Sequence, residues 1–297
     1  MEIKPGSYAS NRILVTGAGG FIGSRLCEKL VERGASVRAF LRYTSRREPG
    51  LLRFVPKPIF DQIELVQGDL RDSSAIEMAA QDADVIFHLG ALISIPYSYL
   101  HPVETVETNL LGTMNILEAC RKTGAKLIHT STSEVYGTAL QVPIDENHPL
   151  QAQSPYSASK IAADKLVESY YRSFDVQTVT VRPFNTYGPG QSNRAVIPTI
   201  ITQALAGNVV KLGNLEALRD FTYLDDSVEG FLSAGLTELW NGETYNLGTG
   251  EEVSIGSVAE LIFKLMGRNP EIEVEAQRIR PEKSEVMRLI SNNQKAK

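Results

Sequence analysis

The sequence predicts an α/β protein built on a parallel, doubly wound sheet. Short apolar runs typical of buried strands alternate along the chain with longer segments whose apolar residues recur at helical spacing. A glycine-rich loop joins the first apolar run directly to the first helical segment. Alternation of this kind places helices on both faces of one parallel sheet, and 297 residues suffice for one large or two medium domains.

The composition is that of an ordinary globular protein, with 42% hydrophobic and 22% charged residues. A net charge of −5 argues against a nucleic-acid partner. No apolar run reaches membrane-spanning length and no secretory segment opens the chain, so we expect no membrane partner and a cytoplasmic location. Cys27 and Cys120 lie among apolar residues in helical segments, which favours reduced core cysteines over a disulfide. We expect no metal site.

The first predicted strand, 12–16, runs into a loop rich in glycine and then into a helix over 24–33. Glycine is needed where the backbone turns tightly and comes close to a pyrophosphate, and the helix N-terminus then faces that anion. Glycines alone are weak evidence, but their place between a strand and a helix is specific. We therefore expect a nucleotide-binding loop that contains Gly17, Gly20, Phe21, Ile22 and Gly23.

The second predicted strand, 36–41, lacks the acidic residue that ends this strand in many dinucleotide sites. Leu41 stands there and Arg42 follows, with Arg46 and Arg47 close behind. Loss of the carboxylate removes the repulsion against a 2′-phosphate, and arginine offers a planar fork of donors to it. We therefore favour NADP as the cofactor without excluding NAD. The alternative is a solvated basic loop.

The next two predicted strands, about 63–66 and 84–89, carry cofactor candidates at their carboxyl ends, where ligands bind in such sheets. Asp69 follows the earlier strand and is expected to hold the adenine edge. His88 is more typical of a packed histidine at a strand end than of a catalytic group. The remaining cofactor candidates in this region are Leu70, Leu89 and Ala91.

A long helix predicted over 104–122 precedes the fifth strand, 126–130. Asn109 lies on one face of that helix, where it could orient a loop or a water near the site. The fifth strand delivers residues 131–134 to the carboxyl edge of the sheet. Downstream, the pattern predicts a polar connection, a helix and the sixth strand, over 143–155, 156–171 and 178–181.

Tyr156 and Lys160 are one helical turn apart and lie on the same face. A free tyrosine has a pKa of about 10, and a neighbouring ammonium lowers that pKa, which gives a group able to take a proton from a hydroxyl. Thr132 offers a hydroxyl that shares the proton, and Glu134 offers a carboxylate two residues on. The Tyr-x-x-x-Lys spacing also occurs by chance on amphipathic helices, so its value depends on the nucleotide loop upstream.

The motifs occur in an order that resembles a known family. They read Thr-Gly-Ala-Gly-Gly-Phe-Ile-Gly, Gly-Asp-Leu-Arg-Asp, His-Leu-Gly-Ala, Ser-Thr-Ser-Glu-Val-Tyr-Gly, Tyr-x-x-x-Lys and Arg-Pro-Phe-Asn-Thr-Tyr-Gly-Pro. Over nearly its whole length the chain resembles the extended short-chain dehydrogenase/reductases that act on nucleotide sugars. The resemblance implies a nicotinamide cofactor that oxidises the sugar transiently at C4. It also implies a homodimer formed through two long helices, here 105–121 and 156–171.

Two domains follow from the same resemblance. A Rossmann domain for the NAD(P) cofactor would span 8–182 plus about 223–247. A smaller C-terminal α/β domain for the nucleotide sugar would span 183–222 plus about 248–297. The segment 291–297 resembles the point where the family begins its last helical segment, so we expect the C-terminal domain to be truncated here.

Glu134 distinguishes members of this family. Its C4 epimerases usually carry a neutral residue there, whereas the 4,6-dehydratases need a base for the C5 proton and an acid for the departing C6 hydroxyl. The dTDP-glucose dehydratases place an aspartate where this chain has Ser133, and a serine cannot supply that acid alone. The GDP-mannose dehydratases also show Thr-Ser-Glu and use NADP. By resemblance to them, Glu134 would serve both steps.

The resemblance is closest to the LegB-like 4,6-dehydratases of nucleotide-linked N-acetylglucosamine, with a UDP- or GDP-linked sugar as the substrate. It assigns the chemistry to Thr132, Ser133, Glu134, Tyr156 and Lys160. It assigns substrate binding to Asn185, Arg194, Arg219 and Arg280, the arginines being suited to a diphosphate.

Several alternatives stay open at this point. The protein could be a C4 epimerase in which Glu134 is incidental, or a UDP-glucuronate decarboxylase, because decarboxylases also show Thr-Ser-Glu. It could also be a non-catalytic member that binds NADP and regulates or scaffolds a partner. For the predicted substrate arginines, above all Arg194, the alternative is a surface ion pair.

Overall fold

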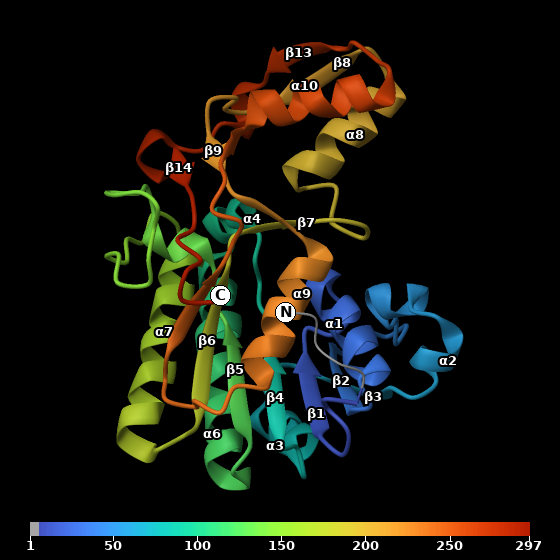
Figure 1. Cartoon of the computed structure of the whole chain (residues 1–297), viewed down its shortest axis with the longest axis vertical. Coiled ribbons are helices and arrows are strands. Elements are labelled where there is room, and N and C mark those ends of the chain that lie inside the picture. Colours follow the sequence, from blue (N-terminus) through green and yellow to red (C-terminus); the bar gives the residue numbers. More distant parts are fainter. Residues whose placement is uncertain (1–5) are drawn as a thin grey trace.

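The computed structural model describes residues 6–297 and contains the predicted parallel sheet, which has seven strands (Figure 1). Its strand order is β11-β6-β5-β4-β1-β2-β3. The strands are β1 (Arg12–Thr16), β2 (Ser36–Arg42), β3 (Glu64–Gly68), β4 (Val85–His88), β5 (Lys126–Thr130), β6 (Thr178–Pro183) and β11 (Thr244–Leu247). The chain reverses direction across the sheet between β1 and β4, which creates a crevice at their carboxyl ends.

Different helices cover the two faces of the sheet, because successive strand residues point to opposite sides. Ile13 and Val15 of β1 belong to one core, and Leu14 belongs to the other. Helices α1 (Phe21–Glu32) and α9 (Leu224–Gly235) close the first core. The second core is closed by α3 (Ser73–Ala80), α6 (Gly112–Thr123) and α7 (Pro155–Phe174).

A smaller part of the chain forms its own core beyond the end of β6, at the top of Figure 1. Helices α8 (Val196–Ala206) and α10 (Ile255–Met266) pack there against the parallel pair β8 (Val209–Leu212) and β13 (Glu271–Val274). Short strands link this part to the main sheet: β7 (Asn185–Tyr187) with β10 (Phe221–Tyr223), and β9 (Leu218–Arg219) with β12 (Val253–Ser254) and β14 (Arg288–Leu289). The domain boundaries expected from the sequence stay a prediction.

Short helices make up the remaining regular structure between residues 6 and 297. They are η1 (Gly50–Phe54), α2 (Lys57–Phe60), α4 (Ile95–Leu100), α5 (Pro102–Val106), η2 (Glu107–Leu111), η3 (Ser133–Tyr136), η4 (Ala276–Arg278) and η5 (Glu282–Ser284).

One local prediction is confirmed and another is refined. Cys27 and Cys120 are buried free thiols, as expected. The long helix predicted over 104–122 is interrupted by the π-helical turn η2, between α5 and α6. A π turn inserts one residue into the helix and changes the direction of the side chains that follow, which the sequence pattern does not reveal.

Asp220 fastens the smaller part of the chain to the main sheet. Its fully buried carboxylate accepts hydrogen bonds from the backbone N–H groups of Thr249 (2.8 Å), Gly250 (2.9 Å) and Ser291 (3.1 Å). The Thr249 hydroxyl donates a fourth bond at 2.6 Å. Three segments distant in sequence therefore meet at one charged group that is satisfied by hydrogen bonds alone.

Replacing this carboxylate should destabilise the fold. We expect Asp220→Asn to lower the free energy of unfolding by about 3 kcal/mol, because the new amide N–H₂ would face backbone N–H donors. Asp226, an exposed residue of α9, provides the matched control, and Asp226→Asn should change stability by less than about 0.5 kcal/mol. Urea titration measures both values. Equal unfolding midpoints for the two variants would contradict this role of Asp220.

Candidate functional site

The glycine loop lies at the carboxyl end of β1 and requires glycine at two positions. Gly17 has φ +69°, and a Cβ there would lie 2.7 Å from the backbone nitrogen of Gly90. A Cβ at Gly23 would lie 2.3 Å from the Gly17 carbonyl oxygen. Gly20 precedes helix α1 and has no side chain that could cap it. The first backbone N–H groups of α1 are therefore available to bind an anion. Phe21 and Ile22 begin that helix and pack on the core below.

A hollow opens beside this loop, between the carboxyl ends of β1, β2, β3 and β4. Five of the residues predicted to bind the cofactor line this hollow, namely Gly17, Arg42, Asp69, Leu70 and Ala91. Leu89 lies next to it and donates its backbone N–H to the Thr16 carbonyl. Both carboxylate oxygens of Asp69 accept bonds from Arg71, at 2.8 and 3.0 Å, and this arginine lowers the pKa of Asp69 to about 2. The glycine loop and the hollow together fit a dinucleotide.

Arg42 reaches the rim of the hollow but has a partner there. Its guanidinium lies 3.5 Å from a carboxylate oxygen of Glu104, whose other oxygen accepts the Tyr97 hydroxyl at 2.5 Å. Arg46, in the loop that follows, is exposed and pairs with Glu48 at 3.8 Å. The structure therefore brings Arg42 to the hollow, and Arg46 stays outside the residues that line it.

Tyr156 and Lys160 lie on the inward face of α7 and are 6% and 3% exposed. Ser154 caps this helix in a capping box with Ser157, which fixes where the first turn begins. The Lys160 ammonium donates to the Thr130 carbonyl, at the end of β5, over 2.6 Å. Thr132 follows two residues later and caps the short helix η3 by accepting the Glu134 N–H at 3.2 Å.

The predicted effect of Lys160 on Tyr156 is wrong for this arrangement of side chains. Burial raises the pKa of Tyr156, and its hydrogen bond with Thr132 offsets only part of that rise. The ammonium is directed to the Thr130 carbonyl, and burial lowers the pKa of Lys160 to about 8. Desolvation, which the sequence does not report, is the largest cause, and the nearby carboxylates of Glu134 and Asp164 raise the pKa of Tyr156 further. These side chains by themselves hold Tyr156 in its neutral form.

Two arginines from the C-terminal part converge on Glu134. Arg280 lies 3.2 Å from a Glu134 carboxylate oxygen. Arg219 is 6% exposed and donates to the Leu218 carbonyl at 2.9 Å, and burial lowers its pKa. A buried guanidinium with an incomplete set of acceptors is typical of a site for an anion.

Glu134, Arg219 and Arg280 form a largely buried cluster. Of the other predicted substrate and catalytic residues, two are buried and one lies on an exposed loop outside it. Ser133 is buried beside Glu134. The side-chain oxygen of Asn185 is buried and lacks a protein partner within the part of the chain that the structure describes. Arg194 lies on an exposed loop before α8, and the structure does not bring it into the buried cluster.

Two buried residues help to position the site although the sequence indicated one of them only weakly and did not predict the other. Asn109, in the π turn, bonds both the N–H (2.7 Å) and the carbonyl (2.9 Å) of Leu92, and it donates to the Ser159 hydroxyl (2.9 Å). It thereby ties the segment that follows β4 to α7. Asp164 was not predicted at all. Its signal is a carboxylate spaced four residues after Lys160, on the inward face of the same helix.

His88 is a packed histidine, as expected. Its ring nitrogens lie 2.7 Å from the Thr16 hydroxyl and 3.1 Å from the Thr113 hydroxyl, and burial holds its pKa well below the usual value.

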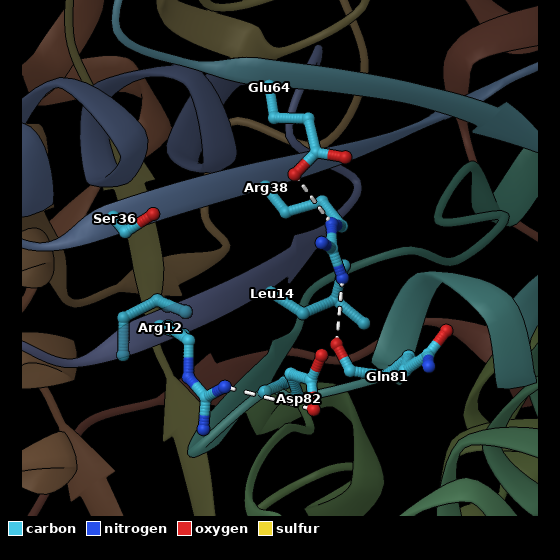
Figure 2. A pocket seen from close by; sticks show the side chains of 9 residues that line it. Arg12, Leu14, Ser36, Arg38, Glu64, Gln81 and Asp82 are labelled. Carbon is cyan, nitrogen blue, oxygen red and sulfur yellow. Dashed lines mark hydrogen bonds and ion pairs between the residues drawn. The ribbon is translucent and has the colours of Figure 1, made fainter.

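A second hollow lies at the amino ends of β1, β2 and β3, opposite the glycine loop (Figure 2). The two arginines that line it are paired within the protein. Arg38 crosses it, donating to Glu64 (2.8 Å) and to the carbonyls of Ala79 (2.8 Å) and Gln81 (2.9 Å). Arg12 pairs with Asp84 at 3.1 Å and with Asp82 at 3.8 Å. Both guanidiniums are thus used within the fold, where Arg38 satisfies carbonyls at the end of α3.

Within residues 6–297, no group of three or more His, Cys, Asp or Glu side chains is placed to hold a metal ion. None of the helices in that range is long and apolar enough to span a membrane.

Comparison with known proteins places this geometry among enzymes of nucleotide sugars. A family model described as GDP-mannose 4,6 dehydratase matches residues 14–297. The chain is 35% identical over 268 residues to a dTDP-glucose 4,6-dehydratase of Mycolicibacterium smegmatis, covering 88% of this chain and 79% of that protein. It is 34% identical over 275 residues to a UDP-glucose 4-epimerase of the same organism, covering 90% and 87%.

Two plant relatives are longer than this chain. It spans 41% of a trifunctional UDP-glucose 4,6-dehydratase, epimerase and reductase of Arabidopsis thaliana, and 60% of UDP-glucuronic acid decarboxylase 1 from that plant, at 32% identity to each. In both cases the match covers about nine tenths of this chain, at 90% and 88%.

Among solved structures, the dTDP-glucose 4,6-dehydratase DesIV of Streptomyces venezuelae, with NAD and TYD bound, matches with a TM-score of 0.87 at 27% identity. That match covers 96% of this chain and 89% of the other.

Proposed function

The chain belongs to the extended short-chain dehydrogenase/reductase family of nucleotide-sugar dehydratases, epimerases and decarboxylases, and on that premise we propose that it is a nucleotide-sugar 4,6-dehydratase. Glu134 carries the proposal. Its carboxylate lies in the turn capped by Thr132 and is largely buried, beside two arginines. A C4 epimerase has no need of a base at this place, whereas a dehydratase must remove the C5 proton of the sugar.

The first step is the oxidation of the sugar at C4. A bound nicotinamide cofactor would accept hydride from C4 of the sugar and later supply hydride to C6. Tyr156 takes the proton of the C4 hydroxyl, and Thr132 hydrogen-bonds to the Tyr156 phenol, while Lys160 holds the end of β5 through the Thr130 carbonyl. The resulting C4 ketone acidifies the neighbouring C5 proton.

Glu134 then removes the C5 proton and passes it to the hydroxyl that leaves C6, so that water departs. Ser133 has no acidic proton to give, which leaves the carboxylate of Glu134 to serve both transfers. C5 is reprotonated after hydride reaches C6, and this balances the proton taken earlier from the C4 hydroxyl. The product is a 4-keto-6-deoxy sugar, still linked to its nucleotide.

Arg219 and Arg280 are proposed to bind the diphosphate. The ion pair between Arg280 and Glu134 supports this role, because a diphosphate offers the guanidinium a stronger anionic partner and would free the carboxylate for catalysis. Asn185, with its buried unpartnered oxygen, would contact the substrate near its phosphates. We propose N-acetylglucosamine as the sugar, linked to UDP or GDP. The expected homodimer, the cytoplasmic location and a role for Arg194 stay predictions.

The product mass and one substitution test the function. We expect the wild-type protein to convert one of the UDP-, GDP- or dTDP-linked sugars glucose, N-acetylglucosamine, mannose and glucuronate into a product lighter by one water. Glu134→Gln should still transfer hydride from C4, seen as absorbance of the reduced nicotinamide, but form product at least about 100-fold more slowly. Mass spectrometry and absorbance measure the two steps.

Glu282→Gln is the control, because Glu282 is an exposed acid of the C-terminal part. It should leave both steps unchanged. A product of unchanged mass but altered chromatography would identify an epimerase, and loss of carbon dioxide from the glucuronate would identify a decarboxylase. Either result, or full activity of the Glu134→Gln variant, would overturn the proposal.

We further propose that the cofactor is NADP, with Arg42 against the 2′-phosphate, although the dehydratase structure compared above holds NAD. Arg42→Ala should weaken NADP binding about 10-fold or more while leaving NAD binding unchanged, because one charge-assisted contact is lost. Isothermal titration of cofactor-free protein measures both affinities, and Arg46→Ala is the control because its side chain lies outside the hollow. Tighter binding of NAD by the wild-type protein, with no effect of Arg42→Ala, would assign NAD instead.

A further inference from the structure

Asp164 is a buried carboxylate with an unusually full set of donors. It lies on α7 one turn beyond Lys160 and is 6% exposed. One oxygen accepts the His129 Nε2 at 3.2 Å. The other accepts the Ser131 hydroxyl at 2.8 Å and the Arg182 guanidinium at 2.9 and 3.2 Å.

The partners of Asp164 are held in place from other elements. Arg182, on β6, donates to the Tyr136 hydroxyl at 2.9 Å and lies over that ring at 5.0 Å, and the Tyr136 hydroxyl donates to Asn246 at 2.8 Å. This interlocking leaves the carboxylate with a single position. Although burial by itself raises the pKa of Asp164, the bond from His129 and the nearby positive charges lower it to about 2, so the group is an anion at neutral pH.

Lys160 and Asp164 form hydrogen bonds with two neighbouring residues at the end of β5. Lys160 donates to the carbonyl of Thr130, and Asp164 accepts the hydroxyl of Ser131. The next residue is Thr132, whose hydroxyl serves Tyr156 and caps the turn that carries Glu134. Together with the backbone bond from Ser131 to the Val181 carbonyl, two side chains four residues apart on α7 therefore help to fix the end of β5, which Thr132 and Glu134 follow.

The negative charge of Asp164 also affects the pKa of Lys160. Lys160 and Arg182 are buried cations near it. Burial lowers the pKa of His129 to about 4 and keeps that ring neutral. His88, whose ring lies 5.9 Å from His129, is neutral for the same reason. Burial lowers the pKa of Lys160 to about 8, and the Asp164 charge opposes that fall. Of the carboxylates near Lys160, Asp164 is the one that supports its protonated form.

We propose that Asp164 is a positioning residue for the reaction, which fixes the end of β5 and keeps Lys160 charged while Tyr156 accepts a proton. The proposal rests on the hydride chemistry proposed for Tyr156 but not on the fate of the C5 proton. It therefore applies equally to an epimerase or a decarboxylase, and it can fail or succeed separately from the dehydratase assignment.

The charge is tested by the pH dependence of kcat. In Asp164→Asn the support for the ammonium is lost, so the pKa of Lys160 falls further. The alkaline limb of the profile should then move to lower pH by about one unit or more, with kcat about 10-fold lower at that limb. Asp164→Glu keeps the charge and should restore the alkaline limb. Glu168→Gln, one turn further along α7, removes a partly exposed carboxylate that pairs with Lys165 and Arg172 and should leave the whole profile unchanged.

The positioning is tested by Ser131→Ala, which removes a single donor and leaves all charges in place. We expect kcat to fall about 5- to 10-fold with an unchanged KM and an unchanged alkaline limb, because the residue before Thr132 loses its side-chain hydrogen bond to α7 and keeps only its backbone bond to the Val181 carbonyl. Thermal unfolding reports separately on folding, and Ser131→Ala decides the proposal if Asp164→Asn does not fold. A wild-type kcat in Ser131→Ala, or a folded Asp164→Asn protein with an unmoved alkaline limb, would overturn the proposal.

Discussion

The contact between the end of β5 and the inward face of α7 determines the arrangement of this site. A lysine and an aspartate one turn apart hold Thr130 and Ser131, and the chain that continues from there carries Thr132 and Glu134 in its next turn. The strand alone could not place these groups, because its hydrogen bonds to the sheet end where the turn begins. Burial makes the contact rigid and also sets its electrostatics, since it depresses the pKa of Lys160 and raises that of Tyr156.

Two clusters of charged side chains adjoin this contact. In the first, the Asp164 carboxylate accepts hydrogen bonds from His129, Ser131 and Arg182, so it is fully used within the protein. In the second, Arg219 and Arg280 lie near the carboxylates of Glu134 and Glu285, and the guanidinium of Arg219, which is 6% exposed, donates to the Leu218 carbonyl. A buried guanidinium is costly unless an anion completes its hydrogen bonds. A nucleoside diphosphate would do so, and its arrival would also release the carboxylate that we assign to the C5 proton.

Local patterns in the sequence predicted much of this fold and the outline of the site. Six of the seven parallel strands contain segments expected from apolar runs, and the tight turn at Gly17 is indicated by its glycines, so these features can be recognised from one segment at a time. Effects that depend on burial between distant segments were not visible. The pKa of Tyr156 moves opposite to the prediction, and the cluster around Asp164 draws on α7, β5 and β6 together. The π turn that places Asn109 is equally hidden, because a helical pattern with one inserted residue still reads as a helix.

The position of a deuterium label is the most direct test of the central claim that Tyr156 and Glu134 together turn a C4 hydroxyl and a C6 hydroxyl into a ketone and a methyl group. The nucleotide sugar that the protein converts would carry deuterium at C4, and nuclear magnetic resonance would locate the label in the product. The account predicts deuterium in the C6 methyl group of a product lighter by one water. Deuterium that remains at C4, in a product of unchanged mass, would contradict it.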